Sequence, residues 1–235
     1  MLQQDTSSTV CEVCKGTTWI LIQKTSTFKR CECYERSQRI ERLKNLGIDL
    51  EDTKMVKDYK AFDDITKKAK SEVIKFIKNF GSNSGEAICL LGTSGSGKTM
   101  LSLAIVKELI KTHSVAYMPY LNVLTEIKSN ILDYEYTMKT LRKYMDAELL
   151  IIDDLYKDIL LNGDISSKIN KSDLKYLYEI INYRYLKKKP TIVNSEASPK
   201  TMINIDMALA SRLFERNVII AFDDFKYNYR LKDFI

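Results

Sequence analysis

Short runs of apolar residues alternate along this chain with longer segments whose apolar residues recur every three or four positions. The uninterrupted runs, which have the length and composition of buried strands, cover residues 87–91, 115–118, 149–152, 191–193 and 218–222. Helical periodicity covers residues 34–46, 67–80, 100–111, 173–189 and 207–216, and an amphipathic helical pair is expected within 119–147. Unbroken apolar strands are typical of a parallel sheet covered on both faces. The pattern therefore predicts an α/β fold with helices flanking a parallel sheet.

The turn between the first of these strands and the helix that follows it has the complete G-x-x-x-x-G-K-[ST] pattern of a phosphate loop. Its members are Gly92, Thr93, Ser94, Gly95, Ser96, Gly97, Lys98 and Thr99. A strand before the loop and a helix after it are the context that phosphate binding needs, which argues against a chance Gly/Ser turn. We expect the loop to bind ATP, with Lys98 at the β- and γ-phosphates and the Thr99 hydroxyl on Mg²⁺.

Two adjacent carboxylates, Asp153 and Asp154, end the apolar run at 149–152. The C-terminal end of a central strand is where α/β sheets bind their ligands. Behind a phosphate loop, the pair predicts that Asp153 holds Mg²⁺ as a Walker-B acid and that Asp154 polarises the attacking water. The alternative is that one of these residues caps the next helix.

The strand at 191–193 also ends in polar residues, Asn194 and Ser195. An additional strand between the loop strand and the acidic strand, together with this polar end, favours a water-activating NTPase over a nucleoside kinase. Asn194 is the candidate sensor of the γ-phosphate and Ser195 its neighbour. A cap for a helix near Pro199 is the competing interpretation.

Arginines are the side chains best suited to the charge that develops on a transferred phosphoryl group, and a neighbouring subunit sometimes supplies them. Arg212, in the helix at 207–216, and Arg230, near the end of the chain, are the candidates. Arg216 and Arg184 are reserves. A lone arginine on a helix is more often a surface residue.

Four of the five cysteines form two close pairs, Cys11-x-x-Cys14 and Cys31-x-Cys33, separated by 16 residues. In a reducing compartment this spacing indicates thiolate ligands for a structural Zn²⁺, with free or redox-active thiols as the alternative. The segment is too short to build a core of its own, so the metal would drive its folding. Cys89, in an apolar strand, is expected to be a core residue.

The composition fits one α/β domain with a small appendage, since 45% of the 235 residues are hydrophobic and 29% are charged. We expect a zinc-binding module at 1–46, a linker at 47–60 and the ATPase domain at 61–235. No apolar run is long enough for a membrane helix and the N-terminus lacks a signal-peptide pattern, so a cytoplasmic protein without membrane partners is expected. The net charge of +6 favours anionic partners only mildly.

Together these motifs resemble the DnaC/DnaI-type replicative helicase loaders, especially those carried by phages. The resemblance rests on the order of the two cysteine pairs with Gly16-Thr17-Thr18-Trp19 between them, the phosphate loop, Ile-Ile-Asp-Asp-Leu at 151–155, Tyr-Arg-Tyr at 183–185, Ser-Arg-Leu at 211–213 and Tyr-Arg at 229–230. The loaders are AAA+ ATPases related to DnaA. The similarity implies a finger arginine at Arg212, a sensor arginine at Arg230 and a sensor at Asn194.

The resemblance also implies partners: a hexameric replicative DNA helicase that is gripped by the zinc module, single-stranded DNA, and further copies of the chain. Only nineteen residues follow Arg216, too few for the helical lid of larger AAA+ proteins. DNA is expected along the helices between Pro119 and Ala147 if those helices do not simply bury their aromatics. The candidate contacts there are Lys128, Lys139, Arg142, Lys143, Tyr134, Tyr136 and Tyr144.

Two other functions share parts of this pattern. An IstB-type transposition helper has the same ATPase core and usually lacks the zinc module, and a non-catalytic adaptor would bind ATP only as a conformational clamp. Many relatives have Ser-Asn where this chain has Ser195-Glu196, so the sensor can shift by one residue.

Overall fold

The computed structural model describes residues 10–81, 85–168, 171–231 and 234. The expectation about a signal peptide rests on residues 1–9, which lie outside these ranges. The chain forms two compact units, residues 1–48 and 49–235, and each is described by itself.

The first unit contains a hairpin followed by a helix. Strands β1 (Trp19–Ile22) and β2 (Thr27–Arg30) pair antiparallel, and Cys31 is the N-cap of α1 (Glu32–Asn45). The helix was predicted at 34–46, whereas the hairpin was not, because each of its strands has only 4 residues and shows no alternation of apolar and polar positions. The guanidinium of Arg30 lies over the Trp19 ring at 3.9 Å and over the Tyr34 ring at 4.1 Å, which ties the hairpin to the helix.

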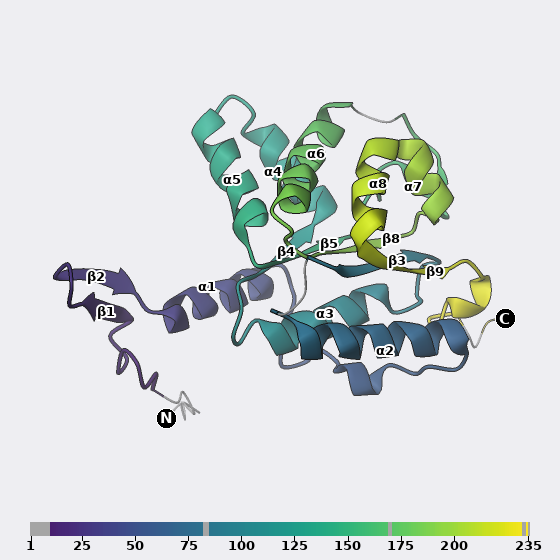
Figure 1. Ribbon diagram of the computed structural model, residues 1–235. Helices are drawn as coiled ribbons and strands as arrows, with labels where there is room; N and C mark the ends of the chain where they lie inside the picture. Colours follow the sequence, from purple (N-terminus) through teal and green to yellow (C-terminus); the bar gives the residue numbers. More distant parts are fainter. Residues whose placement is uncertain (1–9, 82–84, 169–170, 232–233, 235) are drawn as a thin grey trace, which may run out of the picture. The chain divides into compact units, whose positions relative to one another are not determined.

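The second unit is built on a five-stranded parallel sheet in the order β4-β5-β8-β3-β9 (Figure 1). The strands are β3 (Ala87–Gly92), β4 (Val115–Pro119), β5 (Leu149–Asp153), β8 (Thr191–Ser195) and β9 (Asn217–Phe222). Every residue of β3, β5 and β8 is buried, which confirms the buried strands predicted at 87–91, 149–152 and 191–193. The predicted α/β parallel-sheet fold is confirmed.

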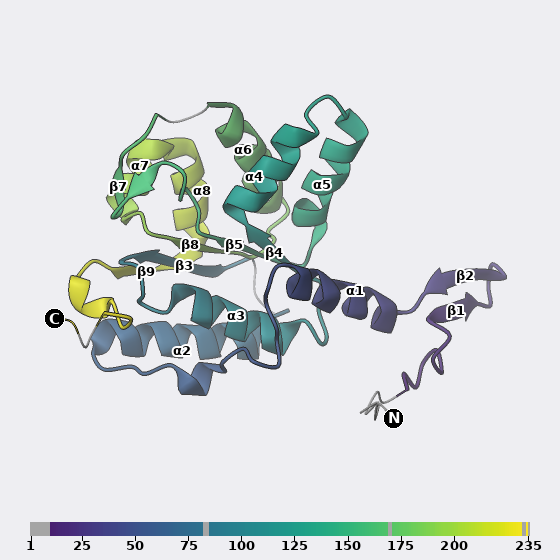
Figure 2. The same ribbon diagram turned by 180° about the vertical axis from the view of Figure 1, so that it is seen from behind.

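Helices cover both faces of this sheet (Figures 1 and 2). On one face lie α2 (Asp64–Asn79) and α3 (Lys98–Leu109). On the other face lie α4 (Tyr120–Ser129), α5 (Tyr134–Asp146), α6 (Lys171–Leu186), α7 (Pro199–Ile205) and α8 (Met207–Arg216). Because helices cover both faces of the sheet, side chains on both sides of a central strand are buried. Apolar and polar residues therefore do not alternate along these strands.

The strand that separates β3 from β5 in the sheet is β8, which comes later in the chain than both. The strand that lies between them in the sequence, β4, is instead at the edge of the sheet. The order brings the ends of three strands together: the phosphate loop after β3, Asp153 at the end of β5 and Asn194 in β8.

Short elements complete the second unit. They are the 3-10 turns η1 (Val56–Asp58) and η2 (Phe225–Tyr227), and a hairpin of β6 (Leu160–Leu161) and β7 (Asp164–Ile165). The carboxylate of Asp63 caps α2 by accepting from the Thr66 N–H at 2.9 Å, and it also accepts from the Tyr227 hydroxyl at 2.8 Å. The C-terminal segment is thereby held beside the start of α2.

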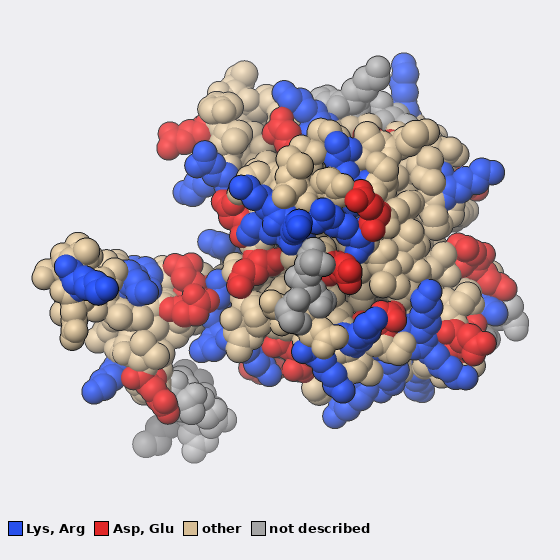
Figure 3. Space-filling view, in the orientation of Figure 1, with Lys and Arg blue, Asp and Glu red and all other residues tan. Residues whose placement is uncertain are grey.

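Among the described residues, only β9 and η2 follow α8, so no helical lid is built from them. Within the same ranges, no helix combines the length and apolarity that crossing a membrane requires. Lys67, Lys68, Lys75 and Lys78 of α2 are exposed to solvent. Figure 3 shows Lys and Arg side chains along the lower edge of this view.

Candidate functional site

The phosphate loop joins β3 to the first turn of α3. Gly97 is the N-cap of α3 with φ +90°, a left-handed conformation that glycine adopts without strain. A Cβ on Gly97 would meet the Tyr59 ring at 2.7 Å, so only glycine fits this approach. The Tyr59 hydroxyl donates to the Ser96 carbonyl at 3.1 Å. A glycine-lined turn at a helix N-terminus is the arrangement that phosphate groups need.

Lys98 lies inside this loop and is 6% exposed. Its ammonium donates to the carbonyls of Gly92 and Thr93, each at 2.8 Å. Burial lowers the pKa of Lys98 to about 8, against the opposing effect of Glu196 and of the two aspartates. A cation held at this depth by carbonyl oxygens fits a site for anionic phosphate groups.

Asp153 is the centre of a hydrogen-bond network at the end of β5. The Thr99 hydroxyl donates to it at 3.1 Å and the Asn194 amide at 2.6 Å, and the Tyr117 hydroxyl donates to its other oxygen. The predicted Mg²⁺ residues Thr99 and Asp153 are therefore in contact, and both offer oxygen ligands of the kind that Mg²⁺ prefers.

Asn194 is fully buried and lies between two elements. Its side-chain oxygen accepts from the Ser102 hydroxyl of α3 at 2.9 Å, and its amide donates to Asp153. These bonds orient the Asp153 carboxylate, and a contact from Asn194 to a γ-phosphate stays a prediction. Ser195 is also buried, and its hydroxyl donates to the Leu155 carbonyl at 2.6 Å.

Asp154 begins a tight turn after β5. Its φ is +55°, an uncommon value for a residue with a side chain, and the turn is fixed because the Leu155 N–H donates to the Asn194 carbonyl at 2.9 Å. Desolvation by the surrounding protein raises the pKa of Asp154, and the neighbouring charge of Asp153 adds to the effect. The strained turn places Asp154 in the wall of a cavity rather than in the sheet.

That cavity has a volume of about 740 Å³ and extends from the phosphate loop to the C-terminal segment. Its lining includes the loop together with Asp154, Lys157, Glu196, Tyr59, Tyr229 and Arg230, and the Tyr229 N–H donates to the Gly95 carbonyl of the loop at 3.2 Å. The predicted sensor arginine therefore shares a cavity with the phosphate loop.

The remaining arginines have different surroundings. Arg212 donates to Asn182, to the Ala208 carbonyl and to the Tyr178 hydroxyl, all at 2.7–2.9 Å, so it lies against α6 of its own chain. Arg184 is fully buried, and its guanidinium donates to backbone carbonyls. Its proposed reserve role at a neighbouring nucleotide is wrong, because a buried side chain cannot reach another subunit.

Comparison with known proteins identifies the family. Residues 24–219 match the model of the family described as IstB-like ATP binding protein. The chain belongs to this family. The uncharacterized protein YqaM of Bacillus subtilis (strain 168) is 34% identical over 238 residues, which is 95% of this chain and 72% of YqaM. The phage-like element PBSX protein XkdC of the same strain is 34% identical over 152 residues, 62% of this chain and 54% of XkdC.

Solved structures agree with this family fold. The crystal structure of the DnaC helicase loader superposes with a TM-score of 0.56 at 22% identity, covering 71% of this chain and 95% of that one. AMPPCP-bound DnaA from Aquifex aeolicus gives a TM-score of 0.60 at 21% identity, with 79% and 56% covered. At these identities the likeness shows the fold alone, and the predicted nucleotide binding is confirmed by the family match, whose description is that of an ATP-binding protein.

The first unit brings the four predicted cysteine ligands together. All four Sγ atoms lie within 4.8 Å of one another, with Cys11 and Cys31 3.8 Å apart and Cys14 and Cys33 3.4 Å apart. Tetrahedral Zn–S bonds of about 2.3 Å would separate sulfurs by about 3.8 Å, so the cluster fits such an ion. Backbone hydrogen bonds, the strongest from Cys14, lower the pKa of Cys11 to about 6, which favours a thiolate there. The cluster is thus a candidate metal centre.

Replacing Cys31 and Cys33 with serine is expected to release one Zn²⁺ per chain and to unfold residues 10–48, because Leu43 is one of few buried apolar side chains there. Elemental analysis and circular dichroism measure these changes. ATP affinity should stay near the wild-type value, since the phosphate loop is in the other unit. The variant Cys89→Ser, which alters a cysteine outside the cluster, is the control for metal content. Absence of zinc from freshly purified wild-type protein would contradict the assignment.

Sequence reasoning missed Tyr117, Ser102 and Lys157. Ser102 in α3 and Tyr117 in β4 carry hydroxyl groups at buried positions of otherwise apolar stretches. A polar residue at such a position was the sequence feature that could have indicated a role near Asp153. One predicted DNA contact is wrong: Tyr144 is 2% exposed and belongs to the core. Tyr134 and Tyr136, by contrast, are exposed.

Proposed function

We propose that this chain is an ATPase that binds a hexameric replicative DNA helicase and delivers it onto single-stranded DNA at the start of replication. The observation that carries the ATPase part is the contact of Thr99 with Asp153 beside a complete phosphate loop, with Asp154 in the wall of the same cavity. Support for the loader part comes from the fold shared with a protein described as the DnaC helicase loader and from the cysteine cluster ahead of the ATPase core.

In this proposal the chain's own residues have separate tasks. The loop and Lys98 bind the phosphates, Thr99 and Asp153 hold Mg²⁺, and Asp154 accepts a proton from the attacking water. Bound Mg²⁺ supplies neutralisation of the charge on the phosphates. Asn194 keeps Asp153 oriented through the hydrogen bond of 2.6 Å. Arg230 contacts the nucleotide of its own chain from the C-terminal side of the cavity.

The proposal assigns the partners to different regions. Residues 1–46 bind Zn²⁺ and the helicase, and residues 61–235 bind ATP and associate with further copies in the cytoplasm of a bacterium. Residues 47–60 connect the two, and Tyr59 within them also packs on the phosphate loop. Single-stranded DNA follows α4 and α5, where the exposed rings of Tyr134 and Tyr136 offer stacking faces. Exposed basic side chains on the same helices are Lys128, Lys139, Arg142 and Lys143.

The decisive experiment incubates the purified chain with the hexameric replicative helicase of its host and a circular single-stranded DNA. We expect ATP-dependent co-elution of helicase and chain, followed by transfer of helicase to the DNA, and ATP turnover that rises when DNA is added. Lys98→Ala is the matched control for nucleotide dependence. If the chain does not co-elute with the helicase but does co-elute with a transposase, the result would instead support a transposition helper, the second function that the family match favours.

A trans-acting role for Arg212 predicts a specific pattern of activity. Arg212→Ala is expected to bind ATP normally but to lose the turnover that depends on assembly, because the finger acts on the neighbouring nucleotide. Mixing Arg212→Ala with Lys98→Ala should restore part of the turnover, since some interfaces then pair an intact loop with an intact arginine. If the mixture co-assembles and stays inactive, Arg216 replaces Arg212 as the candidate.

A further inference from the structure

Lys157 and Glu196 form an ion pair beside the phosphate loop. The Lys157 ammonium lies 2.5 Å from the Glu196 carboxylate. Glu196 directly follows β8, and Lys157 is in the turn after β5, where its N–H donates to the Asp154 carbonyl at 3.1 Å. Because β5 and β8 are neighbours in the sheet, the pair bridges the two strand ends that carry Asp153 and Asn194.

The pair forms part of the wall between two cavities. Lys157 and Glu196 line the nucleotide cavity together with Asp154, and they also line a second cavity of about 840 Å³ on the other side. Ser94, the third residue of the phosphate loop, also lines both cavities. The ion pair therefore lines the same cavity as the loop and Asp154, close enough to Lys98 that the charges of Glu196 and Lys157 both act on it.

The side chains of Lys157 and Glu196 differ in how freely they can change position. The Glu196 side chain is 12% exposed, and its backbone carbonyl is closely packed, since a Cβ on Gly163 would lie 2.9 Å from it. The Lys157 side chain is 41% exposed and has four rotatable carbons. Lys157 is thus the partner that can change position, and Glu196 is the fixed one.

The charges at this end of the cavity determine what the pair would do when a triphosphate arrives. Lys98 already donates to two loop carbonyls, and Asp153 and Asp154 are both anionic groups nearby. A terminal phosphate adds further negative charge next to Glu196, which repels it, and next to Lys157, which attracts it. The same group is missing from a diphosphate.

We propose that Lys157 distinguishes ATP from ADP: it leaves Glu196 to pair with the γ-phosphate, and it returns to Glu196 when that phosphate is lost. Glu196 competes with the γ-phosphate for the ammonium and so sets how strongly the site prefers a triphosphate. The inference rests on the proposed function only in placing the nucleotide phosphates at the loop, and it requires neither helicase nor DNA.

The test measures binding of ADP and of a non-hydrolysable β,γ-methylene ATP analogue to the full chain by calorimetry with Mg²⁺. Lys157→Met is expected to lower the affinity for the analogue at least tenfold and to leave the affinity for ADP within twofold of the wild-type value. Glu196→Gln is expected to act in the opposite direction and strengthen the analogue several-fold, because Lys157 loses its competitor. Lys200→Met, at an exposed lysine outside both cavities, is the matched control and should change neither affinity.

The outcomes separate this inference from the proposed function. Lys98→Ala should weaken both nucleotides, and unchanged binding there would overturn the placement of the phosphates and the inference with it. If Lys98→Ala weakens both but Lys157→Met affects them equally or not at all, the sensing role alone is overturned. Weaker analogue binding by Glu196→Gln would overturn the competition between the carboxylate and the γ-phosphate.

Discussion

Replacing Asp154 with asparagine is expected to reduce ATP turnover by about 10²–10⁴-fold while ATP affinity stays within about threefold of the wild-type value. Asp154 lines the nucleotide cavity but makes none of the hydrogen bonds that join Thr99, Asp153 and Asn194. The amide therefore removes a proton acceptor and leaves the proposed phosphate and Mg²⁺ contacts in place. Steady-state phosphate release and calorimetry measure the two effects.

Asp158→Asn is the matched control for this prediction. Asp158 is an exposed carboxylate of the same connection and does not line the cavity. It should therefore keep both turnover and binding. Equal losses of turnover and binding in Asp154→Asn would point to a structural role, in which the carboxylate holds the left-handed turn after β5.

Replacing Arg184 with methionine is expected to destabilise the second unit by about 3–5 kcal/mol. One guanidinium nitrogen donates to the carbonyls of Tyr144, Met145 and Ala147 at 2.7–3.1 Å, and another donates to the Pro190 carbonyl at 2.6 Å. Tyr144 and Met145 belong to the last turn of α5 and Ala147 is its C-cap residue, so the guanidinium caps the C-terminal end of that helix. Methionine fills similar volume but removes all of these guanidinium donors from a buried site.

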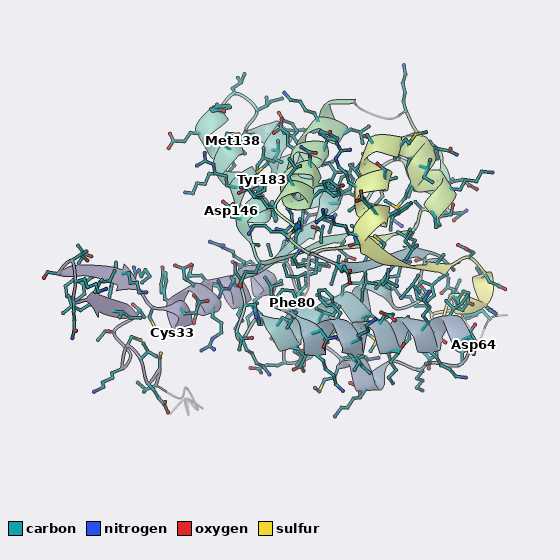
Figure 4. All side chains as sticks on the ribbon, in the orientation of Figure 1. Cys33, Asp64, Phe80, Met138, Asp146 and Tyr183 are labelled. Atoms are coloured by element: carbon teal, nitrogen blue, oxygen red, sulfur yellow. The ribbon has the colours of Figure 1, made fainter. Side chains whose placement is uncertain are left out.

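The surroundings of Arg184 make this an unusual burial of charge. Burial lowers its pKa to about 9, and no side-chain carboxylate accepts from its guanidinium among the described hydrogen bonds. The adjacent Tyr183 hydroxyl donates to Asp146 at 3.0 Å, which joins the same two helices near the surface (Figure 4). Urea unfolding measures the loss, with the exposed Lys187→Met as control, for which a change within about 0.5 kcal/mol is expected. A loss below about 1 kcal/mol for Arg184→Met would mean that water replaces the guanidinium.

Local sequence pattern was enough to predict the strands of the parallel sheet, the nucleotide loop and the group of cysteines. Buried strands such as Leu149–Asp153 are recognised because burial on both faces requires an unbroken apolar run, which is a local property. The loop at 92–99 is recognised because backbone N–H groups can surround a phosphate only with glycine at particular spacings. Cys11, Cys14, Cys31 and Cys33 were grouped correctly because close thiol pairs can meet without help from the rest of the chain.

The set of residues that meet around the site, and the burial of Arg184, depend on tertiary contacts. Strand order depends on pairing between residues far apart in sequence, so the position of β8 between β3 and β5 could not be derived from local pattern. That order creates the bond from Asn194 to Asp153 and the ion pair of Lys157 with Glu196, which span 41 and 39 positions of the chain. The burial of Arg184 has the same origin. A charged side chain is stable in the interior only where hydrogen-bond acceptors surround it, and here those acceptors are carbonyls from distant parts of the chain.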